Sequence, residues 1–313
     1  MRIAALKRRI VLFYFQPQLD GWVSVLRLGL ALQVIFSTLA LRKDWNYLLA
    51  GNGRGLISRD LMEAILDAEN PLIPRLGWLV TLGNHLGVSE GILLSVIWTC
   101  LLVAGCFLFA GIFCRPAAIT AWFLHLCVVK SADLLSYGVD NLTTIGLFYL
   151  MIGPLPDSKS LDWKLRKPPT PDARVVGFYR RLLQMHLCLI YFFGGIAKLA
   201  GIGWWNGTSL WRALTLPPFN VVDPDLILHW KFLLPAAGLF ICVLEIGYPF
   251  LIWSRWTRPV WLICICLMHV MVALTMGMYL FALVMIVLNL AAFGPVGLGD
   301  SALGAPIGQH ICN

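Results

Sequence analysis

Long apolar runs alternate with shorter polar stretches along most of the chain. A helix needs about 20 mostly apolar residues to cross the hydrocarbon core of a bilayer. The pattern therefore predicts an all-α bundle of about eight membrane-spanning helices, which form a single membrane domain over residues 1–313 with no soluble domain. The predicted spans are residues 22–41, 90–113, 116–130, 142–152, 182–200, 232–253, 259–275 and 278–293.

The polar stretches add detail to this arrangement. After the segment GNGRG, the sequence LISRDLMEAILDAEN predicts a short amphipathic helix, and residues 74–85 predict a second helix at the membrane surface. A proline-rich, basic loop over residues 153–181 is expected to connect two halves of the bundle. The N-terminal MRIAALKRR is basic, but the apolar run after it is too short for a cleavable signal peptide.

Composition and charge place the chain in a bilayer. Hydrophobic residues make up 59% of the sequence and charged residues 13%, with a mean hydropathy of +0.79. A soluble domain has about 25% charged residues. The net charge of +8 is explained by Lys and Arg in cytoplasmic loops, so no nucleic-acid partner is expected. With the N-terminus inside, 14 basic residues fall in inner segments and 7 in outer ones, which predicts an N-in, C-in topology.

Ionisable residues inside apolar runs are candidates for function, because each costs about 2.5–3.5 kcal/mol at the bilayer centre. They are Arg27, His125, Lys130, Asp133, His186, Lys198, Glu245 and His269. Arg27 is predicted to reach the interface or to bind a lipid headgroup. Glu245 lies in the middle of its span and needs a partner or a proton; the sequence does not choose between Arg27 and Lys198 as that partner. His186 and His269 are predicted to be core histidines.

The stretch QMHLCLIYFFGGIAKLAGIGWWNG carries the strongest candidate, Lys198. Tyr191 shares its helix face, and Gly194 and Gly195 lie one turn before it, which allows close helix packing or room for a ligand. Two interpretations of Lys198 stay open. It is either a lysine that extends to the outer interface near Trp204 and Trp205, or a desolvated lysine that acts as a neutral base or nucleophile.

A polar break at residues 131–141 is predicted on the same outer side as Lys198. Its side chains Asp133, Tyr137, Asp140 and Asn141 either face Lys198 across a cavity or form a plain extracellular turn. The nine cysteines form no CxxC motif, and the histidine spacing resembles no zinc signature. We therefore predict no metal site.

The run IYFFGGIAKL followed by WWNG resembles the signature of the horizontally transferred transmembrane domain family. That family includes the membrane part of vitamin K-dependent gamma-carboxylase. The segments RLGLAL, GLISRDL and SYGVDNLTTIGLFYL are similar to other parts of the family pattern. The resemblance extends over roughly residues 15–293, and its most specific part is the lysine segment.

The resemblance implies that Lys198 is the base that starts oxygenation of a reduced quinone, with Trp204 or Trp205 and Gly207 in the remaining motif positions. The carboxylase has a catalytic histidine after an asparagine at the start of the fourth helix, whereas this chain has Asp140 and Asn141 there and no histidine. The carboxylase also continues into a large lumenal domain. Both departures argue against carboxylation of a protein.

The predicted function is that of a multi-pass protein, placed in a bacterial inner membrane, that binds a lipophilic quinone such as reduced vitamin K or menaquinone and oxygenates it with Lys198 as base. Tyr191, Gly194, Gly195, Asp140 and Asn141 are expected to line the site. Two alternatives use the same scaffold. One is a non-enzymatic protein that binds or transports membrane lipids, and the other is a maturation or immunity factor that acts with a separate soluble partner.

Overall fold

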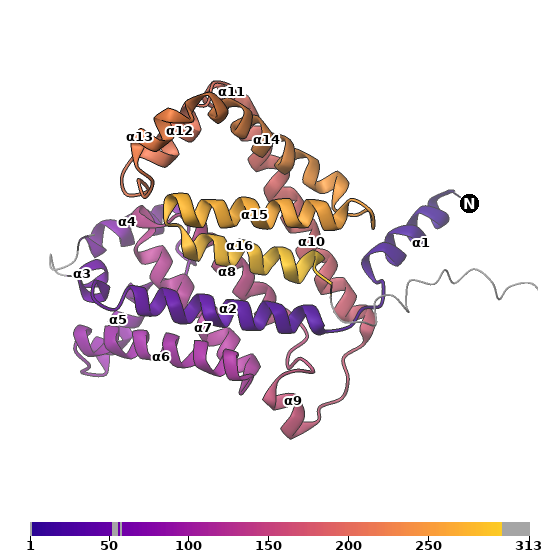
Figure 1. The fold of residues 1–313 in the computed structure, drawn as a ribbon. Coiled ribbons are helices and arrows are strands. Elements are labelled where there is room, and N and C mark those ends of the chain that lie inside the picture. The colour runs from indigo at the N-terminus through magenta and orange to yellow at the C-terminus, as the bar shows by residue number, and fades with distance from the viewer. Residues whose placement is uncertain (1, 52–55, 57, 296–313) are drawn as a thin grey trace, which may run out of the picture. The chain divides into compact units, whose positions relative to one another are not determined.

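A computed structural model describes residues 2–51, 56 and 58–295, and every regular element in these ranges is helical (Figure 1). The α-helices are α1 Arg2–Tyr14, α2 Gly21–Ala40, α3 Trp45–Leu49, α4 Arg59–Glu69, α5 Leu76–His85, α6 Glu90–Ala110, α7 Cys114–Ser131, α8 Gly138–Ile152, α9 Leu161–Arg166, α10 Ala173–Ala200, α11 Ile202–Trp205, α12 Thr208–Thr215, α13 Pro224–His229, α14 Leu234–Leu251, α15 Arg258–Met276 and α16 Tyr279–Phe293. Two short 3₁₀ helices, η1 Asp133–Leu135 and η2 Lys231–Leu233, complete the set. The predicted all-α class is confirmed.

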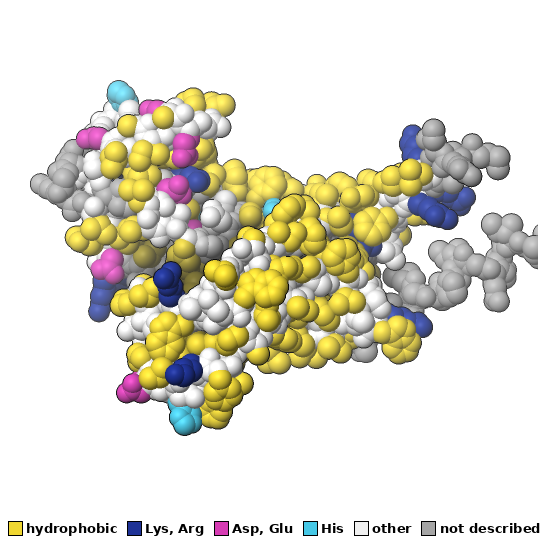
Figure 2. All heavy atoms as spheres, turned by 90° about the horizontal axis from the view of Figure 1, so that it is seen from above, with side chains coloured by type: hydrophobic (Ala, Val, Ile, Leu, Met, Phe, Trp, Pro, Cys, Tyr) yellow, Lys and Arg dark blue, Asp and Glu magenta, His cyan; other side chains and the backbone are white. Residues whose placement is uncertain are grey.

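Five helical segments of the described chain are long and apolar enough to cross a membrane: α2, α6, α10, η2 together with α14, and α15. Large hydrophobic side chains are exposed along them, as expected of helices that face lipid tails. Figure 2 shows many hydrophobic side chains on the face that it presents. The other three predicted spans are also helical, as α7, α8 and α16, but they lie outside this group of five. These features are typical of a membrane-embedded protein.

Helix α10 differs most from its predicted bounds. It begins at Ala173, so Arg180 and Arg181, which the charge pattern assigns to an inner loop, lie within the helix and are buried. The Arg180 Nε donates to the carbonyls of Ala291 and Ala292 near the end of α16. A cation placed at the last carbonyls of a helix is stabilised by the helix dipole, which explains why this arginine is not in water.

The two predicted surface helices are present as α4 and α5. Ser58 caps α4 by accepting a hydrogen bond from the Leu61 backbone, and Met62 and Leu66 form its buried face. Arg75, which precedes α5, is fully buried and lies 2.9 Å from Asp67. Residues 52–55 of the GNGRG segment and the Gly-rich tail after residue 295 lie outside the described residues.

The chain forms two compact units. The first unit comprises residues 1–25, 169–277 and 288–313, and the second comprises residues 26–168 and 278–287. Helices α2 and α16 each contribute to both units. In the first unit, α10 packs along α14, and α11 and α12 also contact α14. In the second unit, α7 packs against both α6 and α8.

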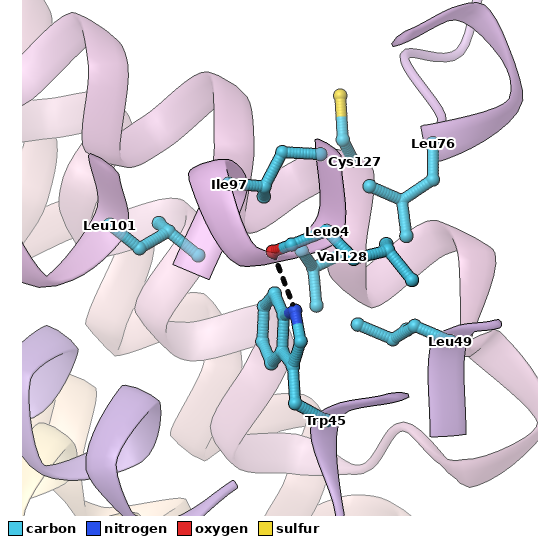
Figure 3. Close-up of a cluster of buried hydrophobic side chains, with 8 residues drawn as sticks. All are labelled: Trp45, Leu49, Leu76, Leu94, Ile97, Leu101, Cys127 and Val128. Carbon is cyan, nitrogen blue, oxygen red and sulfur yellow. Dashed lines mark hydrogen bonds between the residues drawn. The ribbon is translucent and has the colours of Figure 1, made fainter. Parts of the chain in front are cut away.

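A hydrophobic cluster organises the second unit (Figure 3). Its members from α3, α5, α6 and α7 are Trp45, Leu49, Leu76, Leu94, Ile97, Leu101, Cys127 and Val128. The indole of Trp45 is nearly fully buried, and its Nε1 donates to the Leu94 carbonyl oxygen at 2.9 Å. A buried indole usually requires such a partner for its N–H. The short helix α3 is therefore fixed against the long helix α6.

Candidate functional site

Lys198 and Glu245 form an ion pair in the first unit. The Lys198 Nζ lies 2.6 Å from the Glu245 Oε2, and this contact joins α10 to α14. The Glu245 side chain is 8% exposed and the Lys198 side chain 28% exposed. The indole ring of Trp204, in α11, lies 5.7 Å from the Lys198 Nζ, within the range of a cation–π contact. The structure thus selects Lys198 from the two partners that the sequence offers Glu245.

Two neighbouring glycines on α10 have different surroundings. A methyl group added at Gly195 would lie 2.7 Å from the Ile246 Cγ1 and 2.9 Å from the Ile246 backbone nitrogen. A methyl group added at Gly194 would lie 3.6 Å from both the Lys198 Nζ and the Glu245 Oε2, at ordinary contact distance. Gly195 therefore permits close packing of α10 on α14 and offers no space for a ligand, whereas a methyl group at Gly194 would fit in ordinary contact with the ion pair.

A buried polar network lies on the same helix face as Lys198. The Tyr191 hydroxyl lies 2.9 Å from the His269 Nε2 and accepts a hydrogen bond from the Asn289 Nδ2 at 2.7 Å. The Tyr248 hydroxyl donates to the Asn289 Oδ1 at 2.7 Å, and the rings of Tyr191 and Tyr248 lie 4.3 Å apart. Four helices, α10, α14, α15 and α16, supply these four side chains. These hydrogen bonds hold the four side chains in fixed positions within the core.

Arg27 has a different role from the one that the sequence predicts. Its side chain is 2% exposed and its Nε lies 2.6 Å from the Oδ1 of Asp157, which is fully buried. The Arg27 Nη1 also donates to the carbonyls of Leu108 and Phe109 at the end of α6. Arg27 therefore neither reaches a lipid headgroup nor pairs with Glu245; it caps α6 within the second unit.

The predicted outer residues Asp140 and Asn141 belong to α8 in the second unit. The Asp140 Oδ2 accepts a hydrogen bond from the Tyr137 backbone nitrogen at 3.0 Å and so caps the start of α8. Burial, together with the negative charge of Asp140, raises the pKa of Tyr137, which keeps its phenol protonated near neutral pH. Asp133 forms an ion pair with Lys130 at 3.2 Å. Lys198 belongs to the other unit, so a shared site with Asp140 stays a prediction.

Sequence reasoning missed Asn289 and Asp157, each of which completes a buried network. Asn289 is the only amide in its apolar run, and that isolation is the signal that could have marked it. Asp157 follows two prolines in a loop and has no helical pattern around it. Among the described residues, no group of three His, Cys, Asp or Glu side chains is placed to hold a metal ion.

Comparisons of this chain with protein-family models, with curated proteins and with solved structures find no match. The resemblance to the horizontally transferred transmembrane domain family therefore rests on the quoted motifs alone.

Proposed function

We propose that Lys198 and Glu245 form a proton-exchange pair that acts on a lipophilic hydroquinone within the membrane. The observation that carries this proposal is the 2.6 Å contact between the Lys198 Nζ and the Glu245 Oε2, in which the Lys198 side chain remains 28% exposed. A lysine becomes a base only in its neutral form, and a carboxylate in direct contact can take the excess proton. The resemblance of the motif supports the choice of a quinone such as reduced menaquinone or vitamin K.

The proposed chemistry divides between the two side chains. The Glu245 carboxylate accepts a proton from the Lys198 ammonium, and the Lys198 amine then accepts the proton of a substrate hydroxyl beside Gly194. A reduced naphthoquinone supplies that hydroxyl, and its overall reaction with dioxygen gives the epoxide and one water. The Trp204 ring, 5.7 Å from the Lys198 Nζ, stabilises the ammonium after the transfer.

The other groups of the first unit have supporting roles in this proposal. Tyr191 is fixed by His269 and Asn289, so its ring is a rigid wall near the base. Trp205 is half exposed and its Nε1 donates to the Leu199 carbonyl oxygen, as suits an interfacial tryptophan. We place these groups in an eight-span, N-in, C-in protein of a bacterial inner membrane, where the Lys198 end of α10 faces outward.

The test uses purified protein in lipid nanodiscs, reduced menaquinone and dioxygen, with the epoxide detected by mass spectrometry. We expect wild type to form epoxide, and both Lys198→Ala and Lys198→Arg to lose at least about tenfold in rate, because a guanidinium does not supply a neutral base. Lys231→Ala removes a lysine from the same unit and should retain full activity. Thermal unfolding of each variant separates loss of chemistry from loss of folding.

The ion pair itself also favours a second function. Because the Lys198–Glu245 contact joins α10 to α14, it fits a non-enzymatic scaffold that binds lipids or a soluble partner. In that case wild type forms no epoxide, and Lys198→Arg, which keeps the positive charge, behaves like wild type in stability. That combined result would reject the enzymatic proposal.

A further inference from the structure

A cavity of about 210 Å³ lies in the second unit. Residues of α2, α3, α7, α8 and α16 line it, and most of the lining side chains are apolar. An apolar cavity of about 150 Å³ accepts a benzene molecule, so this space is large enough for a body of two fused rings. Neither Lys198 nor Glu245 lines the cavity, so ligand binding there is independent of the proposed function.

The charge of the cavity lining is negative. Asp140 is the one acidic side chain among its described lining residues, and none of these is a lysine or an arginine. Lys130 follows the lining residue Val129, but its ammonium is bound to Asp133 at 3.2 Å. A mostly apolar cavity whose lining carries one carboxylate and no lysine or arginine favours a ligand with a positive charge.

Helix ends of both signs reach the cavity, so they add no preference of their own. Ala40, the last residue of α2, and Ala132, the C-cap of α7, bring two negative helix ends to the lining. Val139 in the first turn of α8 and Leu280 in the first turn of α16 bring two positive ends. The preference for a cation therefore rests on the Asp140 carboxylate.

The cavity also offers an acceptor and two aromatic rings. Gln33 is 1% exposed and its Nε2 donates to the Thr143 Oγ1 at 3.2 Å, while its Oε1 has no hydrogen-bond partner among the described residues. A buried acceptor without a partner is costly, and a ligand N–H group would satisfy it. Trp45 and Tyr137 present rings to the same space, and aromatic faces attract organic cations.

We propose that this cavity binds a protonated amine whose apolar body has about the size of an indole ring. Its ammonium group donates to the Gln33 carbonyl oxygen and the Asp140 carboxylate, and its apolar body packs near Trp45. The hydrogen bond from the Trp45 Nε1 to Leu94 fixes that indole, so part of the site is formed before the ligand binds.

The test compares three probes that share an indole body and differ in one group: tryptamine, tryptophol and indole-3-acetate. Equilibrium dialysis measures their binding to the full chain in phosphatidylcholine nanodiscs, with empty nanodiscs as the blank. We expect tryptamine to bind at least about tenfold more tightly than tryptophol, and indole-3-acetate to bind most weakly. Equal binding of the three probes, tighter binding of tryptophol than of tryptamine, or no binding to folded protein would overturn the proposal.

Three variants locate the site. Asp140→Asn retains an oxygen for the Tyr137 backbone N–H and should remove the preference for tryptamine, whereas Asp60→Asn, an acidic position outside the cavity lining, should not. Gln33→Leu removes the acceptor without a partner and also the hydrogen bond to Thr143, so it should weaken tryptamine binding, and thermal unfolding checks that the variant is folded. Ala40→Phe, at an exposed lining position, should weaken all three probes. An unchanged tryptamine preference in both folded Asp140→Asn and folded Gln33→Leu would also overturn the proposal.

Discussion

Two ion pairs, one in each unit, have the same N–O distance and different surroundings. Arg27–Asp157 and Lys198–Glu245 both close at 2.6 Å. Arg27 is 2% exposed, and all three nitrogens of its guanidinium group donate to Asp157 or to the carbonyls at the end of α6. Lys198 is 28% exposed, and a methyl group at the neighbouring Gly194 would meet the pair at ordinary contact distance.

This difference separates a structural pair from a candidate for chemistry. An enclosed arginine cannot be deprotonated and cannot meet a substrate, so the Arg27 pair serves to fix α6 and the loop of Asp157. A partly exposed lysine in contact with a carboxylate can exchange a proton with a molecule that enters from the membrane. The two pairs have equal N–O distances, so only the burial of the basic side chain distinguishes them.

The largest expected loss of stability follows from substitution of Asp157. Asp157→Ala leaves the Arg27 guanidinium buried without its anion, and we expect the free energy of unfolding to fall by about 3–5 kcal/mol. Chemical unfolding in detergent micelles, followed by circular dichroism, measures this change. The double variant Arg27→Met, Asp157→Leu replaces both charges and should recover most of the loss. A single variant as stable as wild type would contradict the structural role of this pair.

A smaller loss of stability is expected from substitution of Glu245. Glu245→Leu removes the partner of Lys198, but the ammonium retains access to the surface and the Trp204 ring, so the loss should be about 2 kcal/mol. The same unfolding measurement with Lys198→Met, Glu245→Leu completes a double-mutant cycle. If Glu245→Leu costs as much as Asp157→Ala, the contrast between an enclosed and an open pair is wrong.

The helices could be predicted from the sequence because their signals are local. Length and continuous hydropathy mark α2, α6, α10, α14 and α15 without knowledge of their neighbours. The start of α10 could not be predicted in this way. Arginine normally marks a loop at the inner side of a membrane. A buried Arg180 is acceptable here because it donates to carbonyls at the end of α16, more than 100 residues away, and to the side chain of Gln18.

The candidate site could be predicted in part for the same reason. Lys198 and Glu245 are visible as charges in apolar runs, but their pairing depends on how α10 packs on α14, with 47 residues between them. Asp157 lies 130 residues from Arg27 in an irregular loop. The sequence of such a loop has no periodicity from which the direction of the Asp157 side chain could be predicted. The cavity that contains Gln33 is formed by helix ends from distant parts of the sequence, and no single segment reveals it.

The smallest expected effect on stability distinguishes the two adjacent glycines and tests how tightly the chain packs beside Lys198. Gly195→Ala places a methyl group within 2.7 Å of Ile246 and 2.9 Å of its backbone nitrogen, so α10 and α14 must separate and stability should fall by at least about 1 kcal/mol. Gly194→Ala meets its neighbours at 3.6 Å and replaces a helical glycine, so stability should rise by up to about 1 kcal/mol. Each variant is the other's matched control, because the substitutions are identical and one residue apart. If Gly194→Ala is as destabilising as Gly195→Ala, the surroundings of Lys198 are packed as tightly as those of Gly195, and the contrast between the two glycines is wrong.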